Sequence, residues 1–214
     1  MAQRITLDEQ SIESSVQIAA KCIRDGYVVV APHDNGYVLL SDAFSHDAVR
    51  SLHAARESEL GVAAQVLLHD QIQIDGIARG IGDDAKLLMS TFWPGPLSLS
   101  LRPQPGLSWN LGDGGKLDLV NIRIPKNTFL QSLLKESGPL AVASASTPGT
   151  APLLDLANLQ AQDYEVALIV NSGVLLTTQP STVLEITEEG TKLVREGAIS
   201  RDEIEKVIPS VIIG

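Results

Sequence analysis

Strand-forming runs alternate along this chain with segments of helical periodicity. Strands are expected at residues 27–31, 63–69, 97–102, 120–124, 140–144, 166–170, 182–186 and 192–194. The run 97–102 alternates leucine with serine or arginine, which is typical of a strand with one wet face. Because no repeat, low-complexity tract or linker interrupts this order, the sequence predicts an α/β fold in a single domain over residues 1–214.

The expected helices carry start and stop signals. Thr6 and Glu9 have the spacing of a capping box, ahead of apolar positions that recur at helical spacing from Ile12 until Gly26. Ser200 and Glu203 repeat that spacing before a last short helix. Further helices are expected from Ser45 to Arg56, from Asp83 or Asp84 to Phe92, and from Asn127 to about Glu136. The segment 104–116, rich in glycine and proline, is expected to be a loop or flap.

Composition argues against several classes of protein. The net charge is −10, from 16 basic and 26 acidic residues, and the basic residues are scattered, so a freestanding nucleic-acid binder is disfavoured. No apolar run is long enough for a membrane span and no secretory signal is evident, so a cytoplasmic location is expected. Cys22 is the only cysteine, which excludes a disulfide framework, and its place on an apolar helix face predicts a packing role.

Common catalytic motifs are missing or weak. The chain contains neither a phosphate-binding G-x-x-x-x-G-K-[ST] loop nor a G-x-S-x-G elbow. Residues 80–85 imitate a dinucleotide fingerprint, but no clear strand precedes them. The 4 histidines show no metal-ligand pairing, so no protein metal site is predicted; His46 and His53 are expected at the surface of one helix.

Polar groups just beyond apolar runs form the candidate site. Arg123 can bind a carboxylate bidentately, and Ser181 can donate to the same ligand. The turn 144–149 follows a buried strand and offers hydroxyl and backbone N–H groups that suit a phosphate or a carbonyl. The alternative is that Arg123 pairs with a surface acid and the serines cap turns.

The order and spacing of these segments resemble the YrdC-like family, the threonylcarbamoyl-adenylate synthases. The family's Pro-Thr-Asp/Glu-Thr-x-Tyr-Gly segment is similar to residues 32–38, its Lys-x-Arg-Pro segment to 54–57 and its Trp-Pro-Gly-Pro-x-Thr segment to 93–98. Its Val-Arg-x-Pro segment falls on 122–125, Ser-Ala-Asn-x-Ser-Gly on 144–149, Pro-Ser-Thr on 180–182 and Arg-x-Gly-Ala on 195–198. The resemblance covers about residues 15–208.

The resemblance implies a twisted, open mixed sheet with helices packed on it and a concave ligand face, the YrdC-like (RibB-like) fold. It implies that ATP with Mg²⁺, bicarbonate and L-threonine react to threonylcarbamoyl-adenylate for the t6A modification of tRNA. Arg123 and Ser181 would hold the threonine carboxylate, with His33 and Tyr37 beside it, and Arg56, Arg123 and Ser181 would be the catalytic set. The nucleotide would face Arg56, Ser144, Ala145, Ser146 and Arg195. Binding of double-stranded RNA is attributed to the concave face of the family, and with this charge we expect it to be weak.

Several positions depart from the family pattern. The lysine is Ala54, the proline after the arginine is Glu57, and a later basic or polar position is Leu60. The turn's asparagine is Ser146 and its second serine is Pro148. Losing two phosphate contacts weakens ATP binding by roughly 10² to 10⁴. The amino-acid end is therefore better preserved than the triphosphate end.

Three functions remain open at this point. The chain is a divergent synthase, a paralogue that binds a small carboxylate or nucleotide without adenylation, or a carbamoyl-transfer enzyme with another acceptor. His33 is either a general base near neutral pH or a turn residue bonded to Asp34 or Asn35.

Overall fold

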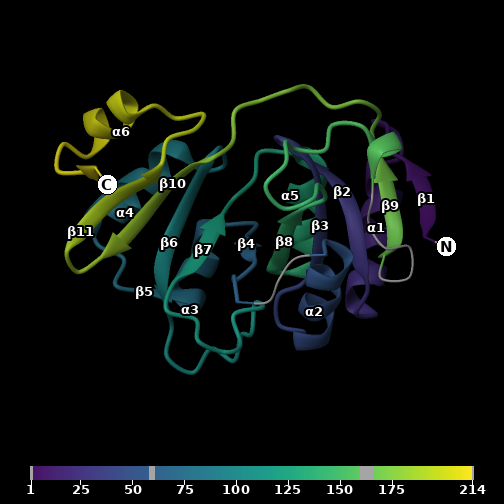
Figure 1. Cartoon of the computed structure of the whole chain (residues 1–214), viewed down its shortest axis with the longest axis horizontal. Helices are drawn as coiled ribbons and strands as arrows, with labels where there is room; N and C mark the ends of the chain where they lie inside the picture. The colour runs from purple at the N-terminus through teal and green to yellow at the C-terminus, as the bar shows by residue number, and fades with distance from the viewer. Residues whose placement is uncertain (1, 58–60, 160–165, 214) are drawn as a thin grey trace.

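A continuous twisted sheet organises the computed structural model, which describes residues 2–57, 61–159 and 166–213 (Figure 1). In this part of the chain, twelve strands lie in the order β1-β9-β2-β3-β8-β4-β7-β6-β10-β11-β12, with β5 paired to β6. Parallel pairs such as β2 with β9 alternate with antiparallel pairs such as β2 with β3, so the sheet is mixed and open as expected. The strands are β1 (Gln3–Thr6), β2 (Val28–His33), β3 (Gly36–Asp42), β4 (Gln65–Leu67), β5 (Ala78–Arg79), β6 (Leu97–Pro103), β7 (Val120–Arg123), β8 (Leu140–Ser144), β9 (Val166–Asn171), β10 (Thr182–Thr187), β11 (Gly190–Arg195) and β12 (Ile212–Ile213).

Two helices cover one face of the N-terminal half of the sheet. The helix α1 packs beside α5, and their apolar stripes meet alternate residues of β2, β3, β8 and β9. Cys22 packs at the edge of this cluster, and burial raises the pKa of its thiol, so the predicted packing role agrees with the structure. The helices are α1 (Ile12–Arg24), α2 (His46–Ala55), α3 (Ile74–Ile77), α4 (Asp83–Phe92), α5 (Thr128–Ser137) and α6 (Arg201–Val207), with 3-10 turns η1 (Gln71–Gln73) and η2 (Leu156–Asn158).

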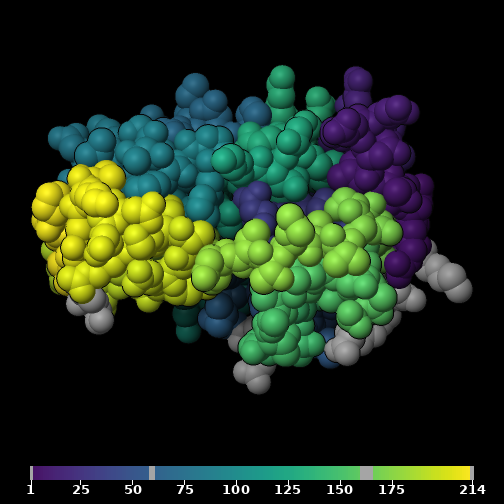
Figure 2. Space-filling model, turned by 90° about the horizontal axis from the view of Figure 1, so that it is seen from above, coloured from purple at the N-terminus to yellow at the C-terminus, as the bar shows by residue number. Residues whose placement is uncertain are grey.

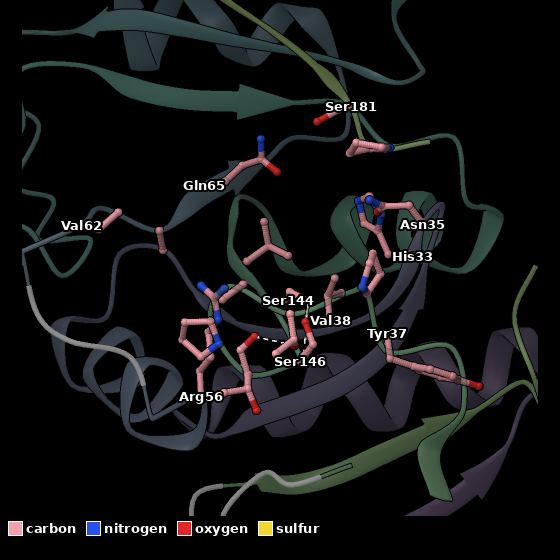
Figure 3. Close-up of a pocket in the computed structure, with 18 of the residues that line it drawn as sticks. His33, Asn35, Tyr37, Val38, Arg56, Val62, Gln65, Ser144, Ser146 and Ser181 are labelled. Atoms are coloured by element: carbon pink, nitrogen blue, oxygen red, sulfur yellow. Dashed lines mark hydrogen bonds between the residues drawn. The ribbon is translucent and has the colours of Figure 1, made fainter. Parts of the chain in front are cut away.

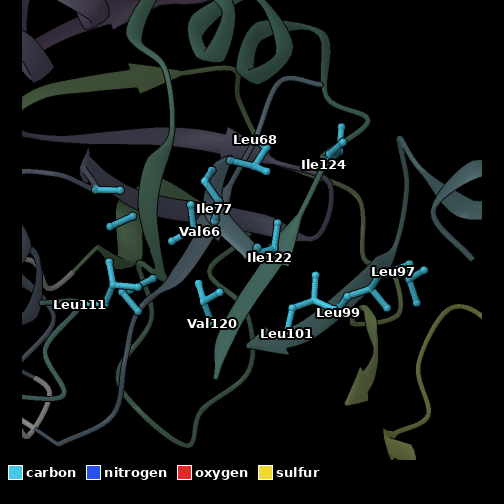
Figure 4. Close-up of a cluster of buried hydrophobic side chains, with 14 of the residues drawn as sticks. Val66, Leu68, Ile77, Leu97, Leu99, Leu101, Leu111, Val120, Ile122 and Ile124 are labelled. Carbon is cyan, nitrogen blue, oxygen red and sulfur yellow. The ribbon is translucent and has the colours of Figure 1, made fainter. Parts of the chain in front are cut away.

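A second apolar cluster lies on the other side of the sheet and continues under its C-terminal half. Side chains from β4, β6 and β7 form its centre, with the loop residue Leu111 against them (Figure 4). In β2 alternate valines belong to the two clusters, because this strand is buried on both faces. No helix among the described residues has the length and apolarity needed to cross a bilayer.

Capping residues in the sequence predicted most helix starts correctly. Ser45 accepts the Ala48 N–H at the start of α2, and Asn127 accepts the Leu130 N–H at the start of α5. Ser200 and Glu203 form the predicted capping box. The capping box predicted at Thr6 and Glu9 is wrong: Thr6 ends β1, and α1 begins at Ile12 after Ser11.

Other expectations fail where tertiary packing decides. His53 is buried, at 5% exposure, because its Nε2 lies 2.9 Å from the Leu111 carbonyl oxygen, whereas His46 is exposed as predicted. Ser98 of β6 is fully buried, so the expected wet face of this strand is turned inward there. The segment 104–116 is a loop, but Trp109 and Leu111 anchor it in the core.

The connection from β9 to β10 crosses the molecule. In Figure 1 it arches over the top, and Figure 2 shows it on the surface between the N-terminal and C-terminal parts. Its Thr178 hydroxyl donates to the Asp34 carbonyl at 3.0 Å, and the Leu175 N–H donates to Leu154 at 2.9 Å. These bonds fix the path of the chain that leads into Ser181.

Candidate active site

One large cavity collects the polar segments that the sequence singles out. Its volume is about 950 Å³, which suits a ligand of nucleotide size. The wall comes from the β2–β3 hairpin, the end of α2, the start of β4, and the ends of β7, β8 and β11, with the residues just before β10. Figure 3 shows Ser181 and Gln65 on one side, and Arg56, Ser144 and Ser146 across from them.

Arg123 is held rigidly at this wall. Its side chain is only 3% exposed; Nε donates to the Gly95 carbonyl at 2.9 Å, and Nη2 donates to Asp34 Oδ2 at 2.6 Å. Burial lowers the pKa of Arg123, and the Asp34 carboxylate counteracts that shift. The pairing with Asp34 means that the expected carboxylate ligand would share this guanidinium with a protein carboxylate.

Gly95 lies in a turn that cannot hold a larger residue. A Cβ at this position would come within 2.4 Å of the Phe92 carbonyl oxygen. The Gly95 N–H donates to Ile124 at 2.9 Å while its carbonyl accepts from Arg123. The turn after α4 thus fixes the arginine of the neighbouring strand.

Ser181 lies at the start of β10 and is 7% exposed. Its hydroxyl accepts from Ser98 Oγ at 2.9 Å and from Arg195 Nη2 at 3.1 Å. Arg195 also donates twice to the Ser181 carbonyl, at 2.8 and 3.1 Å. Arg195 was expected to face the nucleotide; it does line the cavity, and its hydrogen bonds are made to Ser181.

The turn after β8 supplies the opposite wall. The hydroxyls of Ser144 and Ser146 lie 2.6 Å apart, and only one proton lies between them, so the other is available to a ligand. Ala145 between them is buried and does not line the cavity; its N–H donates to the Tyr37 carbonyl at 3.0 Å. The contact of Ala145 with the nucleotide stays a prediction, which its position outside the cavity wall does not favour.

Arg56 caps the end of α2 and reaches the same wall. Its Nε is buried without a hydrogen-bond partner in the described part of the chain, and burial lowers its pKa. A buried cationic donor without a partner is costly, so this geometry favours an anionic group in the cavity. Glu57 follows in a left-handed conformation, with φ 56°, and also lines the cavity.

Tyr37 is among the residues that line the cavity, but its hydroxyl is engaged elsewhere, so its contact with a substrate stays a prediction. It is 1% exposed, and its hydroxyl donates to the Gly173 carbonyl at 2.6 Å and accepts from the Ser172 N–H at 3.0 Å. Figure 3 shows this side chain pointing away from the cavity. Its hydroxyl fastens the β9–β10 connection and is not available to a substrate.

His33 lies on the wall in a neutral state. It is 6% exposed, and its Nδ1 lies 3.1 Å from Asn35 Oδ1, the turn contact that the sequence allowed as one alternative. Burial, and then the Arg123 charge, lower the pKa of His33 from 6.5 to about 4. The imidazole is therefore not a general base that titrates near neutral pH.

Some positions that depart from the family motifs line the cavity, and others do not. Pro148 and Glu57 line the cavity, whereas Ala54 is exposed on α2 and is not part of the wall. Leu60 lies outside the described residues. Asp34 belongs to a segment that the sequence places at the pocket, but its pairing with Arg123 was not predicted. Gln65 was not predicted as a site residue; a glutamine in an otherwise apolar strand was the available signal.

Comparison with known proteins identifies the family. The family model Sua5_yciO_yrdC, described as "Telomere recombination", matches residues 21–197. The chain belongs to this family. A Mycobacterium tuberculosis H37Rv protein named "Putative threonylcarbamoyl-AMP synthase" is 31% identical over 94% of this chain and 92% of its own length.

Solved structures agree with that assignment. Pyrococcus abyssi Sua5 complexed with L-threonine has a TM-score of 0.88 at 27% identity; the match covers 100% of this chain and 62% of that chain. Escherichia coli YciO has a TM-score of 0.78 at 25% identity, covering 92% of this chain and 96% of its own. The predicted family and fold class are thus confirmed, and the chain spans about three fifths of the longer Sua5 protein.

Proposed function

We propose that this chain makes threonylcarbamoyl-adenylate from ATP, bicarbonate and L-threonine, as an intermediate for t6A synthesis. The supporting observation is one cavity with Ser181 on one side and Arg56, Ser144 and Ser146 across from it (Figure 3). Arg123 also lines this cavity, and it bonds Gly95, next to the Pro96 carbonyl that accepts the Thr182 N–H, so it belongs to the Ser181 side. A carboxylate at the first group and phosphates at the second would place the two reactants end to end. Relatives named threonylcarbamoyl-AMP synthase support the same reaction.

The chemistry divides between the two ends. The threonine amine and bicarbonate give a carbamate and water, and a carbamate oxygen then attacks the α-phosphorus of ATP. The bond to pyrophosphate breaks, and pyrophosphate leaves. Arg123 and Ser181 hold the carboxylate so that the carbamate is aimed, while Arg56 stabilises charge on the phosphates.

Mg²⁺ would arrive with the triphosphate. The described residues contain no cluster of three or more histidine, cysteine or acidic side chains that would hold a metal by itself. Mg²⁺ commonly binds through substrate phosphates with one or two carboxylates, and Glu57 is a carboxylate on the cavity wall. Bound there, the ion would neutralise phosphate charge.

Pyrophosphate release tests the proposal. The purified protein should release pyrophosphate from ATP only when threonine and bicarbonate are both present. Arg56→Ala should abolish release while leaving threonine binding intact, because Arg56 lies across the cavity from Ser181. No release at millimolar ATP would overturn the proposal.

A second function is a carboxylate-binding paralogue without adenylation. Glu57 on the cavity wall favours it, because a carboxylate near a triphosphate repels it unless a cation intervenes. Threonine binding by calorimetry without any pyrophosphate release would establish this function instead. Restoration of release by Glu57→Gln, which removes the charge and keeps the backbone N–H that donates to Ala54, would identify the repulsive group.

A further inference from the structure

We infer that Ser98 is a positioning residue, whose hydroxyl orients the Ser181 hydroxyl so that the Ser181 proton points into the cavity. Ser98 is 0% exposed on β6 and is not part of the cavity wall, so it acts through Ser181 and does not touch a ligand. Its Oγ donates to Ser181 Oγ at 2.9 Å. The parallel pairing of β6 with β10 brings these two residues together.

A hydrogen bond from Gln65 to Ser98 supports the direction of the bond from Ser98 to Ser181. Gln65 Nε2 can only donate, and it lies 2.9 Å from Ser98 Oγ. The same amide nitrogen also donates to Asn121 Oδ1, and Asn121 Nδ2 donates to Ser100 Oγ at 2.8 Å. With the two amides in this orientation, Ser98 accepts a hydrogen bond from Gln65 and donates its own hydroxyl hydrogen to Ser181.

Ser181 is saturated as an acceptor. A hydroxyl oxygen has two lone pairs; one receives Ser98 and the other receives Arg195 Nη2, which can only donate. Within the described residues the Ser181 hydroxyl donates to no protein group, and Ser181 lines the cavity. Its proton is therefore left for a ligand oxygen in the cavity, which Arg123 also lines.

The arrangement selects a ligand oxygen that can accept a hydrogen bond, and the charges of Arg123 and Arg195 on the cavity wall favour an anionic one. A hydroxyl that accepts two hydrogen bonds is polarised and becomes a stronger donor. A donor in a buried site rejects a ligand that cannot accept from it. The identity of that ligand as the threonine carboxylate rests on the proposed function.

Calorimetry with L-threonine and, separately, with ATP tests the inference. Ser98→Ala should weaken threonine binding about fivefold to tenfold, the range for one hydrogen bond, and should leave ATP binding within about twofold of wild type. Ser98→Thr, which keeps a hydroxyl, should restore threonine binding. Ser41→Ala is the matched control, because Ser41 is equally buried and its hydroxyl has no hydrogen-bond partner in the described structure.

The double variant distinguishes orientation from general damage. In a Ser181→Ala background, Ser98→Ala should cost no further threonine affinity. Additive losses, unchanged threonine binding in Ser98→Ala, or equal losses of threonine and ATP would each overturn the inference. If the wild type binds no threonine, the proposed function fails. Urea unfolding of the wild type, Ser98→Ala, Ser181→Ala and the double variant then tests the inference: non-additive losses of unfolding free energy support it, and additive losses refute it.

Discussion

His33 predicts a specific dependence of stability on pH. The folded state keeps this imidazole neutral, since burial lowers its pKa from 6.5 to about 4. Between these two values the unfolded chain binds a proton that the folded chain does not. Stability must therefore be fully present above pH 6.5 and must fall as the pH drops toward 4.

The size of the loss follows from the two pKa values. Their difference corresponds to at most about 3.5 kcal/mol, since one pKa unit is worth about 1.4 kcal/mol. Between pH 7 and pH 5 the His33 contribution to the free energy of unfolding should fall by about 2 kcal/mol. Carboxylates also titrate in acid, so the useful quantity is the difference between wild type and His33→Gln.

Urea unfolding at pH 7, 6 and 5 measures that difference. Relative to His33→Gln, the wild type should lose about 2 kcal/mol over this range. His46→Gln is the control, because it removes an exposed histidine and keeps the buried one, so its pH dependence should follow the wild type. Parallel curves for wild type and His33→Gln would refute the neutral, buried state of His33.

Three further substitutions probe the cavity and its supports. Arg123→Ala should weaken threonine binding about 10- to 100-fold in calorimetry, and wild-type affinity would contradict its carboxylate role. Gly197→Ala would place a Cβ 2.2 Å from the Pro180 carbonyl oxygen, just before β10, so the free energy of unfolding in urea should fall by about 1–3 kcal/mol. Gly76→Ala is its control and should show no such loss, because a Cβ at Gly76 would have no neighbour within 4 Å. Gly112→Ala would bring a Cβ within 2.1 Å of His53 at φ +102°, and an unchanged melting temperature would show that this contact can relax.

The parts of the fold that were predicted depend on neighbours in sequence. The caps at Ser45, Asn127 and Ser200 are bonds to residues three positions away, so the sequence alone contains both partners. The strand β1 was missed because its apolar content is low and its register is set by β9, far along the chain. The strand β3 was missed because its start coincides with a turn motif, and pairing with β2 and β8 decides its conformation.

The candidate site likewise contains residues that could be predicted from the sequence and residues that could not. Arg123 and Ser181 could be proposed because polar residues at strand ends gather at one edge of a sheet. Ser98 could not, because its partner lies 83 residues away and the contact depends on which strands are neighbours. Asp34 is comparable: the sequence places it near the turn, but only the fold brings it 2.6 Å from the Arg123 guanidinium.

The net charge of the chain and the charge of the cavity wall lead to different expectations about which anions bind. The net charge is −10, yet the described residues of the cavity wall include three arginines, Arg56, Arg123 and Arg195, and one acidic residue, Glu57. A second carboxylate, Asp34, pairs with Arg123. A small anion inside the cavity interacts mainly with groups within a Debye length, about 8–10 Å at physiological salt, so these arginines dominate its binding. A polyanion such as tRNA extends over the surface and meets the negative field of the entire protein. We therefore expect the cavity to bind the carboxylate and phosphates of the proposed function even though the outer surface binds nucleic acid weakly, and we expect added salt to weaken nucleic-acid binding far more than binding in the cavity.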